Sequence, residues 1–279
     1  MAKTILITGA TDGIGLGAAA KFAELGHHVI MLGRSKQKLE KHHKELQTRY
    51  TQAEISTVCA DLSDLRSLTE IIDSKIRKLG RIDVLVNNAG VFKVKEPMTL
   101  DLLDTRFVVN TIAPYLLTKS LISQMDSDSR VINLSSAAQA PVSLSALSGR
   151  KKLLDNEAYA QSKLALIMWT HYLSGEYGDS GPTFIALNPG SLLGTTMVKE
   201  AYGIEGKPIN IGTEIVLKAS LSESFANANG QYFDNDIGQF SNPHPDALNG
   251  KKVTELVDQI EKILVEIDLV LQDKRGSGA

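Results

Sequence analysis

The chain of 279 residues has 43% hydrophobic and 22% charged residues, a composition typical of a globular protein and against a disordered or collagen-like one. Its 30 Lys and Arg oppose 32 Asp and Glu, and the net charge of −2 gives no reason to expect a nucleic-acid partner. The one cysteine excludes an internal disulfide, and the lack of a signal-peptide pattern or of about 20 consecutive apolar residues favours a cytoplasmic protein without a membrane span.

Short apolar runs alternate with amphipathic patterns along most of the chain. The runs predict strands at 4–8, 29–32, 55–59, 84–86, 130–134 and 183–187. The amphipathic patterns predict helices at 15–25, 36–49, 63–79, 100–124 and 157–177. Apolar strands separated by helices predict an α/β fold with a doubly wound parallel sheet, Rossmann-like, in three α/β/α layers. We expect a single domain over residues 1–279.

Three later regions depart from this alternation. Residues 138–156 and 195–250 are irregular and rich in Gly, Ser, Pro and Asn, and we expect them to be loops that cover the substrate. Residues 251–273 carry apolar side chains at helical spacing and predict a C-terminal helix that covers the core.

A glycine-rich turn, Thr8-Gly-Ala-Thr-Asp-Gly-Ile-Gly15, joins the first predicted strand to the first predicted helix. Glycine permits a tight turn and a close approach of the backbone to a phosphate, and the start of the helix offers free amides to an anion. The spacing of Gly9, Gly13 and Gly15 is neither the common G-x-G-x-x-G pattern nor a P-loop. The turn therefore predicts an anion site, with a purely structural tight turn as the alternative.

Several short motifs in sequence order resemble those of the short-chain dehydrogenases/reductases. Besides the glycine turn, they are Asn87-Asn-Ala-Gly90, Asn110 within Val-Asn-Thr, Leu134-Ser-Ser136, Tyr159-Ala-Gln-Ser-Lys163 and Asn188-Pro-Gly190. The separation of 23 positions from Ser136 to Tyr159 resembles that of the branch that includes retinol dehydrogenases and protochlorophyllide reductases. The resemblance implies hydride transfer between a nicotinamide coenzyme and a carbonyl or alcohol.

Four residues carry the chemistry that the resemblance implies. Tyr159 and Lys163 share one face of a predicted helix, and the ammonium is expected to lower the pKa of the phenol, which exchanges a proton with the substrate oxygen. Ser136, in preference to Ser135, would hold that oxygen, and Asn110 would position a water that links Lys163 to solvent.

The end of the second strand predicts the coenzyme. Gly33 replaces the usual acidic residue and is expected to leave room, and Arg34 offers a cation for a 2′-phosphate, so we expect NADP(H) in preference to NAD(H). Asp12 departs from this expectation, because many NADP-using relatives carry a basic residue at that position of the glycine turn. Lys36 could assist Arg34 or be a solvated lysine. The expected coenzyme-binding residues are Gly9, Thr11, Asp12, Gly13, Ile14, Gly15, Arg34, Asp61, Leu62, Asn88, Ala89, Gly90, Tyr159, Lys163, Pro189, Gly190 and Thr195.

Some of these assignments keep an alternative. Asp61 would accept a hydrogen bond from the adenine amine or only cap the next helix, and Thr195 replaces a family threonine whose aligned position is Gly194. The histidine pairs lack the spacing of a metal site, so none is expected. The alternative functions are a non-catalytic dinucleotide-binding regulator and a sugar-nucleotide epimerase.

The expected partners are a small molecule and further copies of the chain. Tyr202, Ile204, Tyr232 and Phe233 suggest a fairly hydrophobic carbonyl or alcohol substrate. The resemblance implies a homodimer or homotetramer built on helices 100–124 and 157–177.

Overall fold

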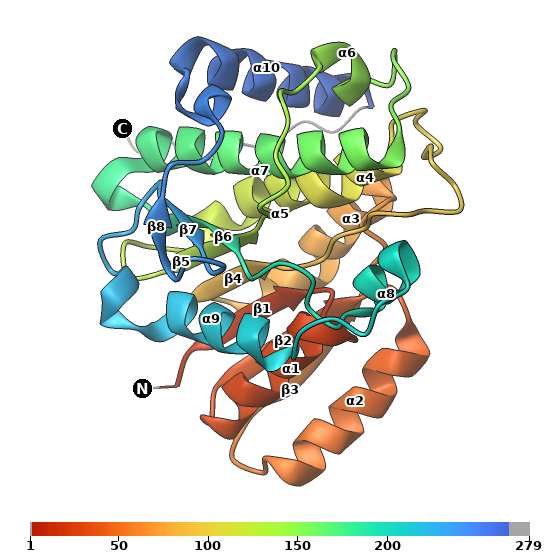
Figure 1. Ribbon diagram of the computed structural model, residues 1–279. Coiled ribbons are helices and arrows are strands. Elements are labelled where there is room, and N and C mark those ends of the chain that lie inside the picture. The colour runs from red at the N-terminus through yellow and green to blue at the C-terminus, as the bar shows by residue number, and fades with distance from the viewer. Residues whose placement is uncertain (1, 268–279) are drawn as a thin grey trace.

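The computed structural model describes residues 2–267, and within them an eight-stranded sheet forms the centre of the molecule (Figure 1). The strand order is β3-β2-β1-β4-β5-β6-β7-β8, and only β7 and β8 pair antiparallel. The strands are β1 (Thr4–Thr8), β2 (His28–Gly33), β3 (Ile55–Cys59), β4 (Val84–Asn87), β5 (Arg130–Leu134), β6 (Thr183–Asn188), β7 (Tyr232–Asp234) and β8 (Gln239–Ser241). The predicted parallel, doubly wound sheet is confirmed.

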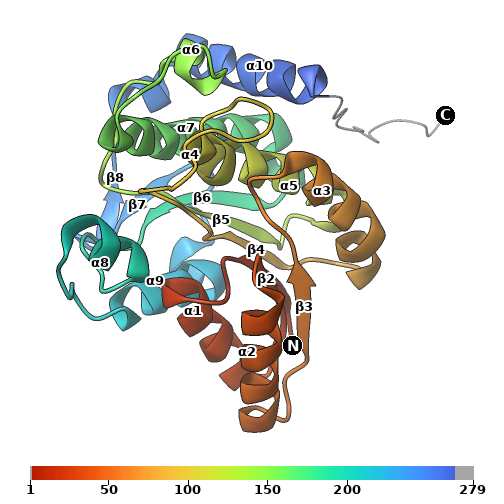
Figure 2. The same cartoon turned by 90° about the vertical axis from the view of Figure 1, so that its right-hand side faces the viewer.

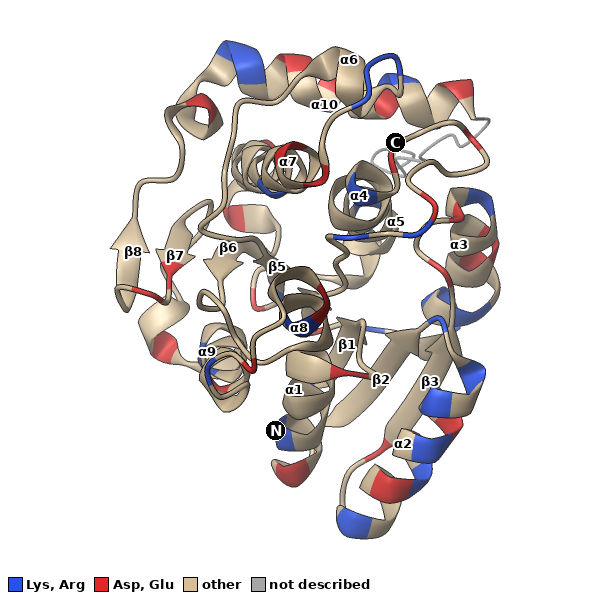
Figure 3. Cartoon of the chain, turned by 45° about the vertical axis from the view of Figure 1, so that its right-hand side comes forward, with Lys and Arg blue, Asp and Glu red and all other residues tan. Residues whose placement is uncertain are grey.

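The interior strands are buried on both faces because helices cover both sides. β1 reads Thr-Ile-Leu-Ile-Thr, and Ile5, Leu6 and Ile7 are all fully buried. Charged residues lie mainly on the surrounding helices and loops, as Figure 3 shows, and the strand ribbons carry few of them. This is the composition expected of a sheet with two covered faces.

The helices divide into two layers, one on each face of the sheet. Apolar residues of α1, α2 and α9 pack on one face, and those of α3, α5 and α7 pack on the other. The α-helices are α1 (Gly13–Glu24), α2 (Lys36–Arg49), α3 (Leu65–Ile71), α4 (Thr105–Phe107), α5 (Ala113–Leu121), α6 (Leu144–Leu147), α7 (Asp155–Tyr177), α8 (Thr196–Tyr202), α9 (Asn210–Leu221) and α10 (Gly250–Glu266).

The helix predicted at 100–124 starts later and is interrupted. Met98 pairs with Asp104 across a turn, and Leu102 has a φ of +59°, so regular helix begins only at Thr105. A π-helical turn, Val108–Ile112, then separates α4 from α5. π-helical turns inside α-helices occur frequently at functional sites.

Residues 195–250 are more regular than predicted. They contain α9, which packs against α1, and the strands β7 and β8, which extend the sheet. Gly212 lowers the helical propensity of α9, yet it is needed there because a Cβ would lie 2.7 Å from Leu193 Cδ1 and 2.9 Å from Ile14 Cδ1. The region also begins with helix α8, so its irregular part is confined to the segments between its elements and to its C-terminal end.

The C-terminal helix α10 lies outside α7 as an additional layer (Figure 2). Its apolar stripe from Val253 to Leu264 is buried, which confirms the predicted cover, and the expected end at 273 lies outside the described residues. Ser162 to Thr170 of α7 are buried without interruption, between the sheet and α10. α10 thus occupies the outer face of α7, and the expected homo-oligomer through helices 100–124 and 157–177 stays a prediction.

Candidate active site

The sequence motifs converge at one edge of the sheet, where the parallel strands have their carboxyl ends. The glycine turn follows β1, Arg34 follows β2, Asn88 follows β4 and Ser136 follows β5. The order of the strands reverses between β1 and β4, which is the position where open α/β sheets bind dinucleotides.

The glycine turn is fixed by close backbone contacts. Gly9 and Gly13 have φ values of +66° and +51°, which favour glycine. A Cβ on Gly15 would lie 2.4 Å from the carbonyl oxygen of Gly9. Asn88 Nδ2 donates to the carbonyl oxygens of Thr8 (2.8 Å) and Gly9 (3.2 Å), so the Asn-Asn-Ala-Gly segment holds the turn in shape.

The start of α1 has amide groups available to an anion. The N–H groups of Ile14 and Gly15 donate to no residue that the structure describes. Asp12 caps the helix, since its Oδ1 accepts from Gly13 N at 2.7 Å. Its Oδ2 accepts from Thr196 Oγ1 at 2.8 Å, so Asp12 also links the turn to α8.

The end of β2 presents a free cation. Arg34 is exposed, and its side chain makes no hydrogen bond or ion pair with any residue between 2 and 267. Lys36 pairs with Glu40 at 3.8 Å, in agreement with a solvated lysine. Gly33 leaves less room than expected, because a Cβ there would lie 2.9 Å from the methyl group of Thr11.

Asp61 is exposed and bonded to its own turn. Its Oδ1 accepts from Ser63 N (2.9 Å) and Ser63 Oγ (2.7 Å), and its Oδ2 has no partner in the described chain. Asp64, not Asp61, caps α3, so the alternative role of Asp61 as helix cap was wrong. Leu62 beside it is buried.

The two serines after β5 have different surroundings. Ser135 is buried and its Oγ donates to the carbonyl oxygen of Lys163 at 3.0 Å, inside the protein. Ser136 is half-buried, its Oγ accepts from Ala138 N at 3.1 Å, and its side chain lies near enough to the Tyr159 phenol to lower the pKa of that phenol. The geometry therefore favours Ser136 as the serine of the site.

Tyr159 and Lys163 lie one turn apart on α7, as expected, with Lys163 Nζ 5.8 Å from the centroid of the Tyr159 ring. Lys163 is only 4% exposed, and its Nζ donates to the carbonyl oxygen of Leu134 at 2.7 Å. Burial lowers the pKa of Lys163 to about 8.

The pKa of the Tyr159 phenol differs from the sequence-based expectation. Burial raises the pKa of the phenol above its ordinary value. The nearby Ser136 side chain lowers this pKa, but by less than burial raises it. Lys163 directs its ammonium at Leu134, so the expected lowering of the phenol pKa by the lysine is not found in this arrangement.

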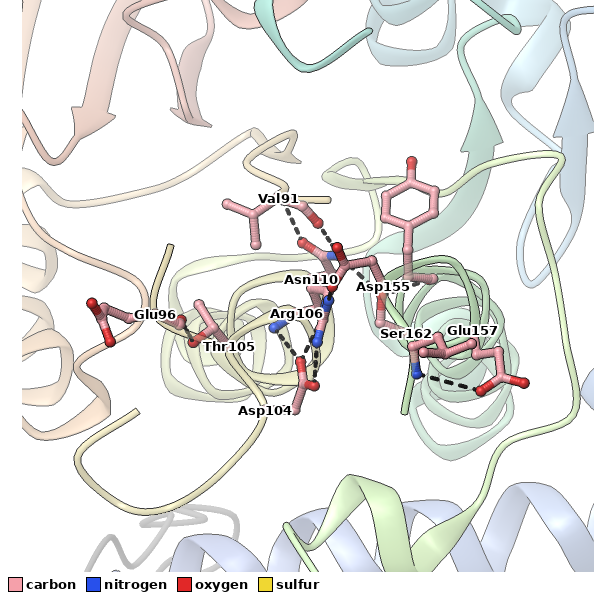
Figure 4. Close-up of polar contacts among 11 residues, drawn as sticks. Val91, Glu96, Asp104, Thr105, Arg106, Asn110, Asp155, Glu157 and Ser162 are labelled. Carbon is pink, nitrogen blue, oxygen red and sulfur yellow. Dashed lines mark hydrogen bonds and ion pairs between the residues drawn. The ribbon is translucent and has the colours of Figure 1, made fainter. Parts of the chain in front are cut away.

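Asn110 lies in the π-helical turn and is fully buried (Figure 4). Its Nδ2 donates to the carbonyl oxygen of Val91 and to Ser162 Oγ, both at 2.9 Å, and its Oδ1 accepts from Val91 N at 2.8 Å. Both amide hydrogens are engaged, so this side chain cannot also donate to a water. A Cβ on Gly90 would lie 3.4 Å from Lys163 Nζ and 3.5 Å from Asn110 Oδ1, so the two side chains meet at Gly90.

The segment after β6 brings Thr195 over the glycine turn. Thr195 caps α8, with its Oγ1 accepting from Val198 N at 3.3 Å, and its methyl carbon would lie 3.4 Å from a Cβ on Gly13. Gly190 has a φ of +123°. Asn235 Nδ2 donates to the carbonyl oxygen of Pro189 at 3.0 Å and fixes the Pro-Gly turn.

Two aromatic residues beside Tyr159 extend the site. The Phe92 ring lies edge-on to Tyr159 with centroids 4.9 Å apart, and it stacks on Tyr202 of α8 at 5.9 Å. The sequence analysis did not select Phe92, although its place two residues after Asn-Asn-Ala-Gly could have indicated it.

Two other residues expected at the substrate are placed elsewhere. Phe233 is buried in the core against Phe225, with ring centroids 5.0 Å apart, so its assignment to a substrate surface was wrong. Tyr232 is also buried, and its hydroxyl donates to the carbonyl oxygen of Ser136 at 3.3 Å, where it supports the serine. Of the four residues expected at the substrate, Tyr202 and Ile204 keep exposed apolar surface.

Residues 2–267 contain no group of three His, Cys, Asp or Glu side chains that could hold a metal ion. Over the same residues, no helix has the length and apolar character needed to cross a membrane. Trp169, which we expect to serve packing or a subunit contact rather than stacking on a substrate, is fully buried against Tyr115.

A dinucleotide turn at the switch point of a parallel sheet, opposite a tyrosine and lysine on one helix, defines a nicotinamide-dependent oxidoreductase. The family model described as short chain dehydrogenase matches residues 3–203, and the chain belongs to this family. Retinol dehydrogenase 13 of Homo sapiens is 31% identical over 253 residues, covering 83% of this chain and 76% of the relative, which supports the retinol dehydrogenase-like branch.

Other similar proteins agree with the family. Polyprenol dehydrogenase of Homo sapiens is 29% identical over 210 residues, covering 72% of this chain and 63% of the relative. The crystal structure of an uncharacterised protein from Mycobacterium paratuberculosis has a TM-score of 0.75 at 25% identity and covers 94% of this chain and 92% of that one. The Rossmann-like fold is thus shared over nearly the whole length.

Proposed function

We propose that the protein is an NADP(H)-dependent oxidoreductase that reduces a carbonyl group to an alcohol or catalyses the reverse reaction. The observation that carries this proposal is the arrangement of Ser136, Tyr159 and Lys163: the serine lies beside the phenol and lowers its pKa, and the buried ammonium lies 5.8 Å from the centroid of its ring. These groups provide a hydrogen-bond donor for a substrate oxygen and a proton donor beside it.

A proton passes between the Tyr159 hydroxyl and the substrate oxygen in this proposal. Ser136 Oγ donates a hydrogen bond to the same oxygen and stabilises the charge that develops on it during reduction. Lys163, with a pKa of about 8, can turn its ammonium toward the phenol and favour the phenolate form. Asn110 keeps the segment at Val91 in place beside Lys163.

The coenzyme, when bound, supplies or accepts the hydride. The free N–H groups of Ile14 and Gly15 fit its pyrophosphate, and the unpaired guanidinium of Arg34 fits a 2′-phosphate. Asp61 Oδ2 is open to the adenine amine. The remaining coenzyme contacts in the proposal come from Gly9, Thr11, Asp12, Gly13, Leu62, Asn88, Ala89, Gly90, Tyr159, Lys163, Pro189, Gly190 and Thr195.

The proposed substrate is a fairly hydrophobic carbonyl compound or alcohol. Phe92 and Tyr202 provide aromatic surface next to Tyr159, and two relatives are named as dehydrogenases of retinol and polyprenol, both apolar alcohols. Residues 138–156 and the ends of 195–250 would cover it. A cytoplasmic location and a homodimer or homotetramer stay predictions.

The two alternatives are a coenzyme-binding regulator without turnover and a sugar-nucleotide epimerase. A regulator has no need of a buried lysine beside a tyrosine, since burying an ammonium is costly. An epimerase would be expected to consume no net NADPH with simple carbonyls.

NADPH oxidation with a panel of aldehydes, ketones, quinones, steroids and retinoids tests the proposal. We expect turnover with apolar members of the panel and faster turnover with NADPH than with NADH. If NADPH binds and no compound is reduced, the regulator is favoured instead.

A further inference from the structure

A buried arginine lies one helical turn before the residues of the site. Arg106 of α4 is only 2% exposed. Asp104 holds it in a bidentate pair, with Nε 2.9 Å from Oδ1 and Nη2 2.7 Å from Oδ2. Its Nη1 donates to Asp155 Oδ1, at the start of α7 (Figure 4). One guanidinium thus connects two helices.

Both connected residues precede a site residue by four positions. Arg106 is four residues before Asn110, and Asp155 is four residues before Tyr159. Residues at this spacing lie on the same side of a helix, one turn apart. The ion pair therefore joins the two helical segments one turn before Asn110 and one turn before Tyr159.

Hydrogen bonds continue the same connection at the level of the site. Asn110 Nδ2 donates to Ser162 Oγ at 2.9 Å, and Thr111 Oγ1 donates to the carbonyl oxygen of Ser162 at 2.8 Å. Ser162 directly precedes Lys163. Asn110 also holds the backbone of Val91, so a shift of α4 relative to α7 would move the segment beside Lys163.

We propose that Arg106 is a positioning residue, which sets the relative placement of Asn110 and the Tyr159–Lys163 pair by joining α4 to α7 through Asp104 and Asp155. This inference rests on the proposed function, because it concerns the geometry in which that chemistry occurs. Arg106 touches none of the reacting groups itself, and its effect passes through the two helices. A bidentate guanidinium suits this task because its planar fork fixes direction as well as distance.

The first turn of α7 offers a matched pair of variants. Asp155 and Glu157 are both exposed carboxylates near the start of the helix, but only Asp155 bonds Arg106, whereas Glu157 accepts from Leu154 N at 3.4 Å. Asp155→Asn and Glu157→Gln remove the same charge from the same helix end. Any effect of the helix dipole or of net charge is common to both.

The test compares kcat, NADPH dissociation constant and amide exchange in these two variants. We expect Asp155→Asn to lower kcat about tenfold, since small displacements of reacting groups cost large factors in rate, with NADPH affinity unchanged. Hydrogen exchange of Val91 N–H, which bonds Asn110 Oδ1, should become faster in Asp155→Asn and stay the same in Glu157→Gln.

The inference is overturned if the two variants have equal kcat, or if Val91 exchanges faster in Asp155→Asn while kcat stays at the wild-type value. Arg106→Lys adds a second arm, because it keeps the charge and loses the bidentate fork, and it should resemble Asp155→Asn in kcat. If the wild-type protein reduces no compound of the panel, the proposed function fails. In that case, an equal rate of hydrogen exchange at the Val91 N–H in the two variants separately refutes the positioning by Arg106.

Discussion

Helices α7 and α8 contribute to the same site but are held in very different ways. α7 is buried continuously from Ser162 to Thr170, between the sheet and α10. α8 has no buried residue, and the contacts that join it to the glycine turn and to Phe92 are a hydrogen bond from Thr196 to Asp12 and a ring contact through Tyr202.

The difference separates two requirements of catalysis. Groups that exchange protons need fixed positions, and the burial of α7 on both faces provides them. A segment at the opening must admit the substrate and coenzyme, and the few exposed contacts of α8 can break at little cost. Changes on α7 should therefore affect the chemical step, and changes on α8 should affect binding.

The largest expected effect is that of Tyr159→Phe. Loss of the proton donor should lower kcat by about a thousandfold, within the range of general acid–base catalysis, with NADPH affinity unchanged. Steady-state kinetics and a coenzyme-binding titration check this. Equal kcat in the variant and the wild type would mean that Tyr159 of α7 takes no part in the chemical step.

A stability effect of about 3 kcal/mol is expected from Lys163, because its pKa is about 8 in the folded chain against 10.5 as the ordinary value. Between these pH values the unfolded chain holds a proton that the folded chain has released, so folded stability rises with pH. The free energy of unfolding of the wild type, relative to Lys163→Met, should therefore increase by this amount from pH 7 to above pH 10.5. Urea unfolding at both pH values measures it, and a constant difference would contradict it.

Lys119 provides a control of opposite sign for that measurement. Burial alone would lower its pKa, but the hydrogen bond to Glu176, with the nearby charges, raises it overall. A raised pKa contributes stability that is lost as pH rises through the pKa of the folded chain. The free energy of unfolding of the wild type, relative to Lys119→Met, should therefore decrease at alkaline pH.

Arg34→Ala should weaken NADPH binding by about 10- to 100-fold, the value of a charge-assisted hydrogen bond to phosphate, and change NADH binding little. Arg34 has no partner in the described chain, so its loss should leave stability unchanged. Titrations with both coenzymes decide the point. An equal loss for NADPH and NADH would show that the cation does not read the 2′-phosphate.

The smallest effect is expected from Tyr202→Ala on α8. Loss of its stacking on Phe92 should raise KM for apolar substrates about three- to tenfold, with kcat and thermal stability unchanged. A lowered kcat at unchanged KM would instead mean that α8 takes part in the chemical step, and the contrast with α7 would fail.

The sequence predicted the parts of the site that depend on local chemistry. Gly9 and Gly13 need positive φ, and Tyr159 and Lys163 need only helical spacing, so short patterns reveal them. Strands β1 to β6 were predicted to within one residue at each end because of their apolar runs, whereas the three-residue strands β7 and β8 were missed.

The parts that escaped prediction depend on contacts between distant segments. The sequence analysis did not select Arg106 or Asp104, because their contact with Asp155 exists only in the folded chain. The apolar stripe of α10 predicted a cover, but nothing local showed that it covers α7. α9 was missed because Gly212, which its close packing requires, weakens the helical pattern.

The central claim is hydride transfer from NADPH to a carbonyl carbon at the Tyr159 site. Reduction with NADPH deuterated at the hydride-donating carbon, followed by mass spectrometry of the alcohol, tests it directly. We predict that the alcohol carries the deuterium and that Tyr159→Phe forms little of it while still binding NADPH. An unlabelled product, or bound NADPH with no alcohol formed from any compound of the panel, would contradict the account.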